Sequence, residues 1–487
     1  METRATHDTD VRIGWLLKLW RQRASEVELR MQGPFARRLR AQAEGVNADA
    51  SRVSRWESGR LRVNRPILRG YEQVVGLDHD LLVATVEGMW RDHGLLPRGT
   101  AEPPSRREVA GGLDDCFQRL DAGQHDGGTW FALAGLVATP GTVVYLPEPF
   151  REEAASRLVE EVPRAVGQAW VRRLEAMRGM LQDELMRPHL VRAIGRQVTE
   201  PSSQAVTDLV ANLHEVGGTA PLEMMVRLAR HESAPVRAGA LWGLEHRLVV
   251  HRLPRELMPA LGRTLAMVVA DDSGRNVDLA LRVAEQLPAE HTGSVAAVVR
   301  QRRGADATVQ ESADRVASRR AAAAAMEALE VDADDVLLGV LGEAFDARRP
   351  NLQHEAWMLL MVGPFRSALA DHLVRRCLAG DPLADVHAAG LTYLATAAQR
   401  SGVVELATAH TGVSPGHAFR ALAHVPGALD PRVAGGVPGA DEMYALGMGR
   451  HPRLHRLAED PAAPAEVRSA ARWWVEHGGA LHDPAAG

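Results

Sequence analysis

The chain has 487 residues, only 4% of them aromatic, and its 62 acidic and 57 basic side chains give a net charge of −5. A chain of this length exceeds one compact core, so we expect several domains, or one domain followed by a helical array. Few aromatic residues and much Ala, Leu, Val and Arg argue against β-sandwiches and barrels and predict an all-α fold.

Cysteine usage and hydropathy limit the cellular compartment. Cys116 and Cys377 are far apart in the sequence, which is typical of a reducing cytosol without structural disulfides. The sequence contains no signal-peptide core and no run of about 18 apolar residues, so we expect a soluble cytoplasmic protein without a membrane partner. Lys18 is the only lysine. Since such Arg usage is typical of a GC-rich genome, Arg abundance alone says little about function.

The N-terminal region predicts five helices between residues 10 and 95. The first, over 11–23, has Ile13, Leu16, Leu17 and Trp20 as its buried stripe. From Arg12 to Arg69 the chain carries 14 basic and 5 acidic residues, a balance of +9, so the remainder sums to −14. This asymmetry is typical of a protein that binds a polyanion. A membrane surface is the other polyanion considered, but this first helix is short and its apolar residues are better used as core.

The segment Asp49–Gly59 predicts one short helix. Asp49 or Ser51 can cap its start, and Gly59 can supply the left-handed residue that ends it. Val53 and Trp56 share the buried face, while the outer face is small, polar and basic. Arg and Ser are suited to contact base edges in a major groove. An ordinary amphipathic surface helix is the alternative.

Residues Val53–Gly59 resemble the recognition-helix signature of the lambda-repressor/Cro-like (XRE) helix-turn-helix family, of the type found in actinobacteria. Pro66–Leu77, with Tyr71 inward, resembles the fourth helix of that fold. The family's second helix usually begins with Gln, whereas the segment expected there is Phe35–Leu39. The following turn, Glu44–Ala48, is about two residues longer than usual.

The resemblance implies a DNA-binding domain over residues 10–95. Its implied base-contacting residues are Ala50, Ser51, Arg52 and Arg55. The residues expected to contact phosphate are Arg37, Arg38, Asn47, Arg60, Arg62 and Arg65. Val53, Trp56 and Tyr71 are the expected core of the helix-turn-helix.

Residues 96–106 are a linker by composition, being rich in Pro. We expect few contacts to cross it, so that the N-terminal domain would fold when separated near residue 100. Residues 107–200 predict a helical connector, in which an apolar stripe recurs at three- to four-residue spacing. Its members are Val166, Trp170, Leu174, Met177, Leu181 and Leu185. The stripe is either core or a coiled-coil-like dimerisation surface.

Beyond residue 200, a Pro-containing turn followed by a helix start recurs. The first apolar residues of successive copies are Val206, Val236, Val277, Leu352, Val386 and Val467. Their spacing is mostly about 30–41 residues or twice that, which resembles HEAT-type or TPR-like repeats and implies an α-solenoid over 201–480. Chance alternation in a chain rich in Ala, Val and Arg is the alternative.

Motifs for enzyme chemistry fail on inspection. Gly412–Gly416 has the G-x-S-x-G spacing of a hydrolase elbow, but Pro415 lacks the N–H that the oxyanion hole requires. No Lys follows Lys18, which excludes a Walker P-loop. His410, His417 and His424 recur every seven residues, yet Gly and Pro interrupt any helix between the first two. We therefore expect no enzyme activity, no cofactor and no metal site.

The sequence thus predicts a transcriptional regulator that binds double-stranded DNA as a homodimer and associates with the nucleoid. The helical repeats would bind a peptide, a small molecule or a protein. The alternative is a protein-interaction scaffold in which the helix-turn-helix contacts protein rather than DNA.

Overall fold

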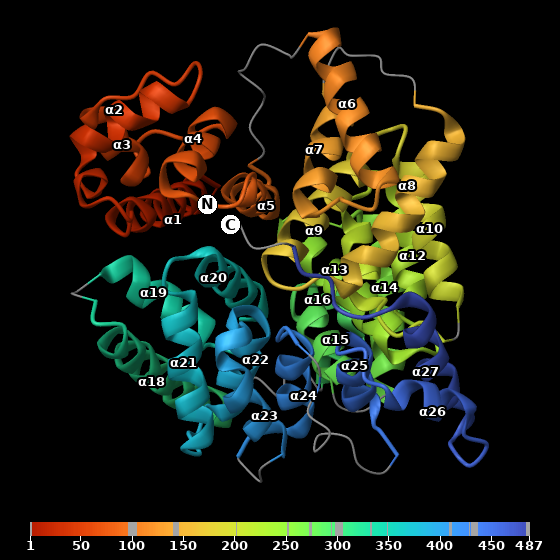
Figure 1. Cartoon of the computed structure of the whole chain (residues 1–487). Coiled ribbons are helices and arrows are strands. Elements are labelled where there is room, and N and C mark those ends of the chain that lie inside the picture. The colour runs from red at the N-terminus through yellow and green to blue at the C-terminus, as the bar shows by residue number, and fades with distance from the viewer. Residues whose placement is uncertain are drawn as a thin grey trace.

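The chain is an all-α protein, as its composition predicts (Figure 1). The computed structural model describes residues 2–95, 105–139, 146–200, 202–250, 253–271, 275–293, 295–297, 305–331, 334–347, 349–408, 412–427, 429 and 437–483. About 74% helix is more than twice the share found in ordinary globular proteins. Within these ranges, the one strand-like pairing is an isolated parallel bridge between Ala165 and Leu481. None of the described helices is both long and apolar enough to cross a bilayer.

The N-terminal domain contains five α-helices and one 3-10 turn. They are α1 (Glu2–Gln22), η1 (Val27–Arg30), α2 (Gln32–Gln42), α3 (Ala50–Glu57), α4 (Arg65–Val75) and α5 (Leu81–Asp92). Helix α1 begins nine residues before the expected Val11. Its early polar residues are used in the fold, since Thr9 is buried and the Asp10 carboxylate accepts from Trp90 at 3.3 Å. Helix α2 begins at Gln32, three residues before the segment expected there, because Pro34 is tolerated in a first turn.

Helix α1 is buried on more sides than its sequence predicts. The expected stripe includes Ile13 and Leu16, which are buried, but Trp15 and Leu19 are buried as well. The indole N–H of Trp15 donates to Asp334 at 3.0 Å, and that of Trp20 donates to the Val362 carbonyl at 3.1 Å. Helix α1 therefore lies between the core of its own domain and residues more than 300 positions away.

A first stack of helices follows the N-terminal domain. It comprises α6 (Arg106–Asp121), α7 (Gly127–Val137), α8 (Glu148–Glu161), η2 (Val162–Arg164), α9 (Gln168–Gln182), α10 (Arg187–Thr199), α11 (Thr207–Ala211), η3 (Asn212–Glu215), α12 (Thr219–Leu228), α13 (Ala234–Val250), η4 (Arg255–Leu257), α14 (Met258–Asp271), α15 (Arg275–Glu285) and α16 (Ala289–Thr292). Alternate helices pack on one another, α11 on α13 and α13 on α15, as in a helical-repeat array.

A second stack completes the chain. It comprises α18 (Ala305–Ala328), α19 (Asp335–Ala344), α20 (Pro350–Val362), α21 (Arg366–Leu378), α22 (Ala384–Leu394), η5 (Ala397–Gln399), α23 (Arg400–Thr408), α24 (Pro415–Ala423), α25 (Ala440–Met448), α26 (Arg453–Glu459) and α27 (Ala465–His477). Five of the six residues that mark the predicted repeats lie in the first turn of a helix, and Val206 is an N-cap. The solenoid-like arrangement is confirmed, and the marked residues lie where helix pairs begin.

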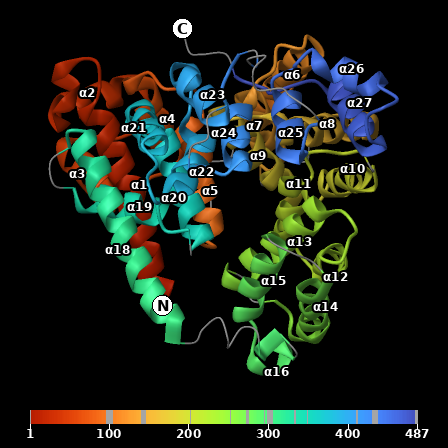
Figure 2. The same ribbon diagram turned by 90° about the horizontal axis from the view of Figure 1, so that it is seen from below.

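The repeats do not form one array over 201–480. One hydrophobic core runs from Val109 to Val295, with contributions from the connector. A second core joins residues 321–474 to the N-terminal domain. Figure 2 shows α16 and α18 standing apart at the ends of the two stacks. The repeat pattern in the sequence cannot show this break, because the sequence of each copy does not depend on which helices it packs against.

Helix α9 lies in the interior of the molecule. It packs against α5, α7, α10, η2 and η3, so the stripe residues within the helix serve as core, whereas Leu185 lies beyond its end and is 45% exposed. Leu174, Met177 and Leu181 are buried within the same subunit. The stripe is therefore not available for a coiled-coil dimer, which corrects that alternative for residues 107–200.

Of the predicted linker, residues 96–104 lie outside the described residues, and Ser105 caps α6 together with Glu108.

Candidate nucleic-acid interface

Local sequence fixes both ends of α3, the helix with the signature residues. The Asp49 carboxylate accepts from the Arg52 N–H at 2.8 Å, so Asp49 rather than Ser51 is the N-cap. Gly59 ends the segment with φ +68°, and a β-carbon there would lie 2.7 Å from the Val11 backbone. A side chain at this position would therefore be strained and would also push α3 away from α1.

Buried residues hold the inner face of α3. Val53 and Trp56 are 0% and 3% exposed, and Tyr71 of α4 is fully buried. Glu57 accepts from Arg21 of α1 through two bonds of 2.6 and 2.9 Å. Because the Glu57 carboxylate is paired with Arg21 inside the core, this pair fixes the orientation of α3 relative to α1.

Glu57 also connects α3 to the neighbouring helices. Its carboxylate accepts from the Gln32 amide at 3.2 Å and from the Tyr71 hydroxyl at 3.3 Å. Burial, together with the Glu57 charge, raises the pKa of Tyr71 well above its ordinary value. Arg21, Gln32 and Glu57 were absent from the predicted site. The only signal for Glu57 is its place in the signature, and its partner Arg21 is 36 residues away.

The outer face of α3 is exposed and polar. Ala50, Ser51, Ser54 and Arg55 are all exposed, which places Ser54 beside three predicted residues. No hydrogen bond or ion pair is recorded for the Arg55 guanidinium among the described residues. Arg52 is partly buried and donates to the Asn47 carbonyl at 2.8 Å, so it stabilises the turn before α3. The free donors on this face are therefore Ser51, Ser54 and Arg55.

Three predicted phosphate contacts surround α3 on the surface. Arg37 and Arg60 are exposed, and so is Asn47. Arg38 is half-exposed and pairs with Glu26 through bonds of 2.9 and 3.0 Å. A DNA phosphate would have to compete with Glu26 for Arg38, whereas Arg37 and Arg60 meet no such competitor among the described residues.

Arg62 and Arg65, both predicted as phosphate contacts, pair with carboxylates of the fold, while their side chains remain 34% and 46% exposed. The Arg62 guanidinium lies 5.1 Å above the Trp90 ring and pairs with Asp10 at 3.2 Å. Arg65 forms a two-bond pair with Glu87 of α5 and lies 5.9 Å from the Phe131 ring of α7. Both guanidinium groups thus face neighbouring helices.

The N-terminal domain docks on the rest of the chain through charged residues. Arg12 of α1 pairs with Glu343 at 2.6 Å and with Glu355 at 3.4 Å. His93, just after α5, lies 3.0 Å from the same Glu355, and this contact raises the pKa of His93 although burial opposes it. The domain is consequently held to the second stack by ion pairs from both α1 and the end of α5.

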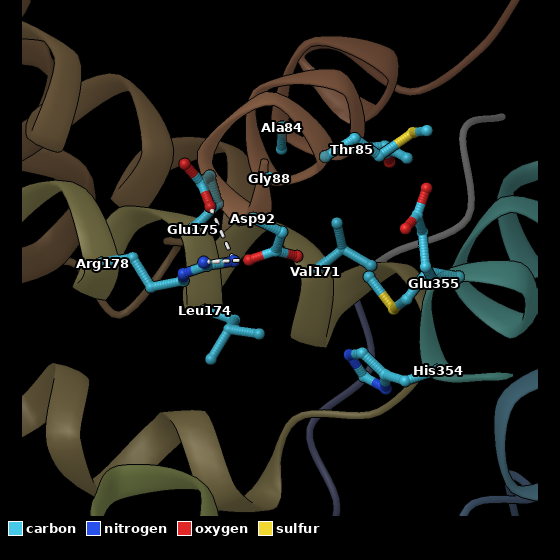
Figure 3. Close-up of a pocket in the computed structure, with 12 residues that line it drawn as sticks. Ala84, Thr85, Gly88, Asp92, Val171, Leu174, Glu175, Arg178, His354 and Glu355 are labelled. Atoms are coloured by element: carbon cyan, nitrogen blue, oxygen red, sulfur yellow. Dashed lines mark hydrogen bonds and ion pairs between the residues drawn. The ribbon is translucent and has the colours of Figure 1, made fainter. Parts of the chain in front are cut away.

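A small cavity lies where α5, α9 and α20 meet (Figure 3). It measures about 30 Å³, enough for one or two water molecules, and its polar wall includes Asp92, Glu175, Arg178, His354 and Glu355. Arg178 pairs with Asp92 and with Glu215 of η3. The lining residues of the cavity come from the N-terminal domain, the connector and the second stack.

The chain is significantly similar to no family model, no curated protein and no solved structure. Among the described residues, no group of three or more His, Cys, Asp or Glu side chains is arranged to hold a metal ion. Cys116 and Cys377 are both buried as free thiols, and burial raises the pKa values to about 11 and about 12.

Proposed function

We propose that the chain is a sequence-specific DNA-binding transcriptional regulator that acts in the cytoplasm on the nucleoid. The observation that carries the proposal is the exposed face of α3, with Ser51, Ser54 and Arg55 directed outward from a helix that Glu57 fixes from behind. Hydroxyl and guanidinium donors on a rigid short helix match the hydrogen-bond pattern of a major groove. The local charge of +9 supplies the attraction to phosphate.

In this proposal the helical stacks are the sensing or recruiting part, and a peptide, a small molecule or a protein binds there. Support comes from the junction of α5, α9 and α20, because the last helix of the N-terminal domain packs against one helix of each stack. The regulator is a homodimer, since one helix-turn-helix contacts only a few base pairs.

The test is selection of duplex DNA from a random pool by the full-length protein at fixed salt. We expect an enriched motif of two related half-sites with centres about 34 Å apart, or a multiple of that distance. Sedimentation of the protein with the recovered DNA should give two chains per duplex. A pool that stays random after several rounds, with folded protein and salt low enough for binding, would overturn the proposal.

A second candidate is a protein-interaction scaffold in which the N-terminal domain binds protein. The observation that favours it is a pair of exposed apolar side chains, Val27 at 69% in η1 and Met31 at 62% at the N-cap of α2. Exposed apolar residues of this size are typical of protein contacts when they adjoin a larger patch. Loss of partner binding in a Val27→Ser, Met31→Ser variant whose DNA selection is unchanged would favour this candidate.

A further inference from the structure

The segment after α27 returns to the middle of the molecule without helical structure. It leaves the helix at Gly478, which has φ +80°, and runs back towards α9 (Figure 1). The Leu481 N–H donates to the Arg164 carbonyl at 2.8 Å, and the Val166 N–H donates to the Leu481 carbonyl at 3.2 Å. These two bonds form the isolated parallel bridge between Ala165 and Leu481.

Asp483 places its carboxylate in a pocket of donors. One oxygen accepts from Arg173 at 2.6 Å and from the Gly127 N–H at 3.0 Å, and the other accepts from Arg172 at 2.6 Å. Arg172 and Arg173 are each 3% exposed. The Gly127 N–H is the first of α7, so its free backbone donor and the helix dipole also favour a negative charge.

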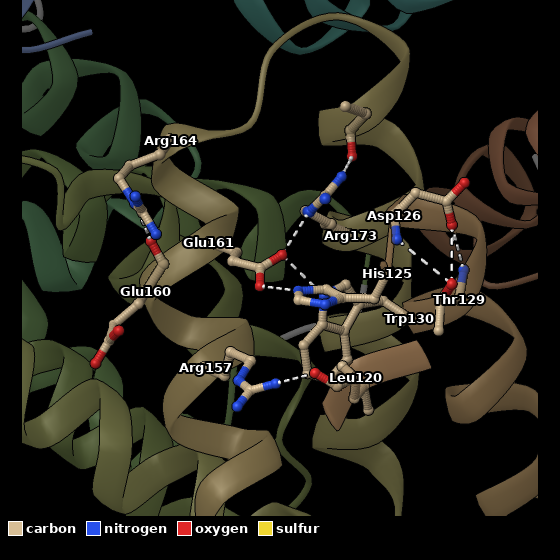
Figure 4. Close-up of polar contacts among 12 residues, drawn as sticks. Leu120, His125, Asp126, Thr129, Trp130, Arg157, Glu160, Glu161, Arg164 and Arg173 are labelled. Atoms are coloured by element: carbon tan, nitrogen blue, oxygen red, sulfur yellow. Dashed lines mark hydrogen bonds and ion pairs between the residues drawn. The ribbon is translucent and has the colours of Figure 1, made fainter. Parts of the chain in front are cut away.

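Figure 4 shows the residues that orient Arg173. The Glu161 carboxylate accepts from Arg173 and from the Trp130 indole, both at 2.9 Å, and lies 2.6 Å from His125. Burial alone would raise the pKa of Glu161, but its bonds to His125 and Arg173 lower it to about 2. Arg173 is thus held in place by a carboxylate that stays ionised, which leaves its Nη1 directed at Asp483.

Arg172 connects the same pocket to the N-terminal domain. Its guanidinium donates to the His79 carbonyl at 3.0 Å and pairs with Asp78 at 3.3 Å. These residues form the turn before α5, where Asp80 adopts φ +61°, a conformation that non-glycine residues rarely take. The Nε of Arg172 is buried without a hydrogen-bond partner among the described residues, so this guanidinium has a spare donor.

We propose that Arg172, Arg173 and the Gly127 N–H form a carboxylate-binding site, which residues 478–483 fill, and that its occupancy fixes the turn before α5. The occupant defines the ligand class: an extended acidic segment with an apolar residue two positions before the carboxylate, as in Leu481–Asp483. An acidic peptide of this form can take the place of the chain's own segment. The consequence for DNA binding rests on the proposed function, whereas the site itself does not.

The test uses the full-length Asp483→Ala variant without DNA, followed by hydrogen exchange of backbone amides. We expect the amides of residues 80–83 and 127–130 to exchange about tenfold faster or more, because hydrogen bonds to charged groups are among the stronger ones. Acetate, as a free carboxylate, should restore protection in a saturable manner, while chloride at matched ionic strength should not. Wild-type protein should show no response to acetate.

Glu476→Ala is the matched control, since it removes an exposed carboxylate from α27 and should leave both regions unchanged. If Asp483→Ala loses its helical content, Asp483→Asn replaces it, and the same acetate response is expected at smaller amplitude. If the Asp483 variant leaves the exchange of residues 80–83 unchanged, the link to the α5 turn is overturned. Faster exchange that acetate and chloride restore equally, or not at all, would overturn the carboxylate site. Because no DNA is present, either failure is distinct from failure of the proposed function.

Discussion

Arg91 in the last turn of α5 donates two hydrogen bonds to a single carboxylate oxygen of Glu175 in α9, at 2.6 and 2.8 Å. Both side chains are buried, with exposed fractions of 8% and 4%. The pair joins the helix that ends the N-terminal domain to the helix at the centre of the first stack. The N-terminal domain and the first stack are therefore joined by a buried ion pair.

We expect Glu175→Ala to destabilise the protein by about 3–5 kcal/mol, because it leaves the Arg91 charge buried without its partner. The double variant Arg91→Met, Glu175→Leu should cost much less, since apolar side chains of similar volume need no pairing. Urea unfolding of the full chain measures both. Asp115→Ala is the control: its pair with Arg119 is exposed and should contribute less than about 1 kcal/mol. Equal stability of the single and double variants would contradict this account.

A fragment of residues 1–95 should not fold into a stable monomer. Trp15 and Trp20 of α1 bond to Asp334 and to the Val362 carbonyl, and the apolar core continues from α1 into the second stack. Without that stack, the buried side of α1 would face water and favour association. Size-exclusion chromatography and thermal melting of the fragment test this expectation. A monomer that unfolds cooperatively would instead support the independent domain that the linker composition predicts.

Local features of the N-terminal domain follow from sequence. The stop at Gly59 and the buried pair Val53 and Trp56 depend on residues within one segment, and local spacing is enough to predict them, whereas it left the N-cap open between Asp49 and Ser51. The all-α class and the starts of the repeat helices follow for the same reason, since helical periodicity is a local property.

The roles of individual Arg residues could not be predicted, because their partners are remote in sequence. Asp10 is 52 residues from Arg62, and Glu87 is 22 residues from Arg65. Both guanidinium groups look like surface charges until the fold brings these carboxylates beside them. The core that the N-terminal domain shares with the second stack could not be predicted either. The apolar residues of α1 are compatible with packing against its own domain alone or against the second stack as well.

Acid should destabilise the protein through buried histidines. Burial lowers the pKa of His424 to about 4, and the ring accepts from Tyr444 while its other nitrogen donates to the Thr392 carbonyl, each at 3.0 Å. A neutral ring suits both bonds. Because the folded pKa lies below the unfolded value of about 6.5, the stability contribution is present above pH 6.5 and is lost as the pH falls towards 4.

We expect the loss from His424 alone to be about 2 kcal/mol at about pH 5. The pKa values of His246 and His387, lowered to about 3 and about 4 chiefly by burial, add losses in the same direction. His424→Asn retains a donor for Thr392 but does not titrate, so its stability should fall less between about pH 7.5 and 5. Urea midpoints at the two pH values measure the difference. Identical pH dependence in the variant and the wild type would show that His424 is not linked to folding.

The last prediction separates base contacts from phosphate contacts on the N-terminal domain, and it depends on the proposed function. Arg55 is exposed on the outer face of α3, where a guanidinium can form two bonds to guanine, worth about 1–3 kcal/mol of discrimination. Arg55→Ala should therefore weaken binding to the selected DNA by about tenfold or more, and weaken binding to random DNA much less. Fluorescence anisotropy at one fixed salt concentration gives the ratio of the two affinities.

Arg37 and Arg62 are the matched controls for this measurement. Arg37 is exposed, so Arg37→Ala should weaken all sequences alike and lower the slope of log affinity against log salt by about one. Arg62 is held by Asp10 and Trp90, so Arg62→Ala should leave that slope unchanged and lower the melting temperature instead. If Arg55→Ala leaves the affinity ratio intact in a folded protein, α3 does not contact the bases through this face. If Arg62→Ala lowers the salt slope as Arg37→Ala does, its pairing in the fold gives way on DNA.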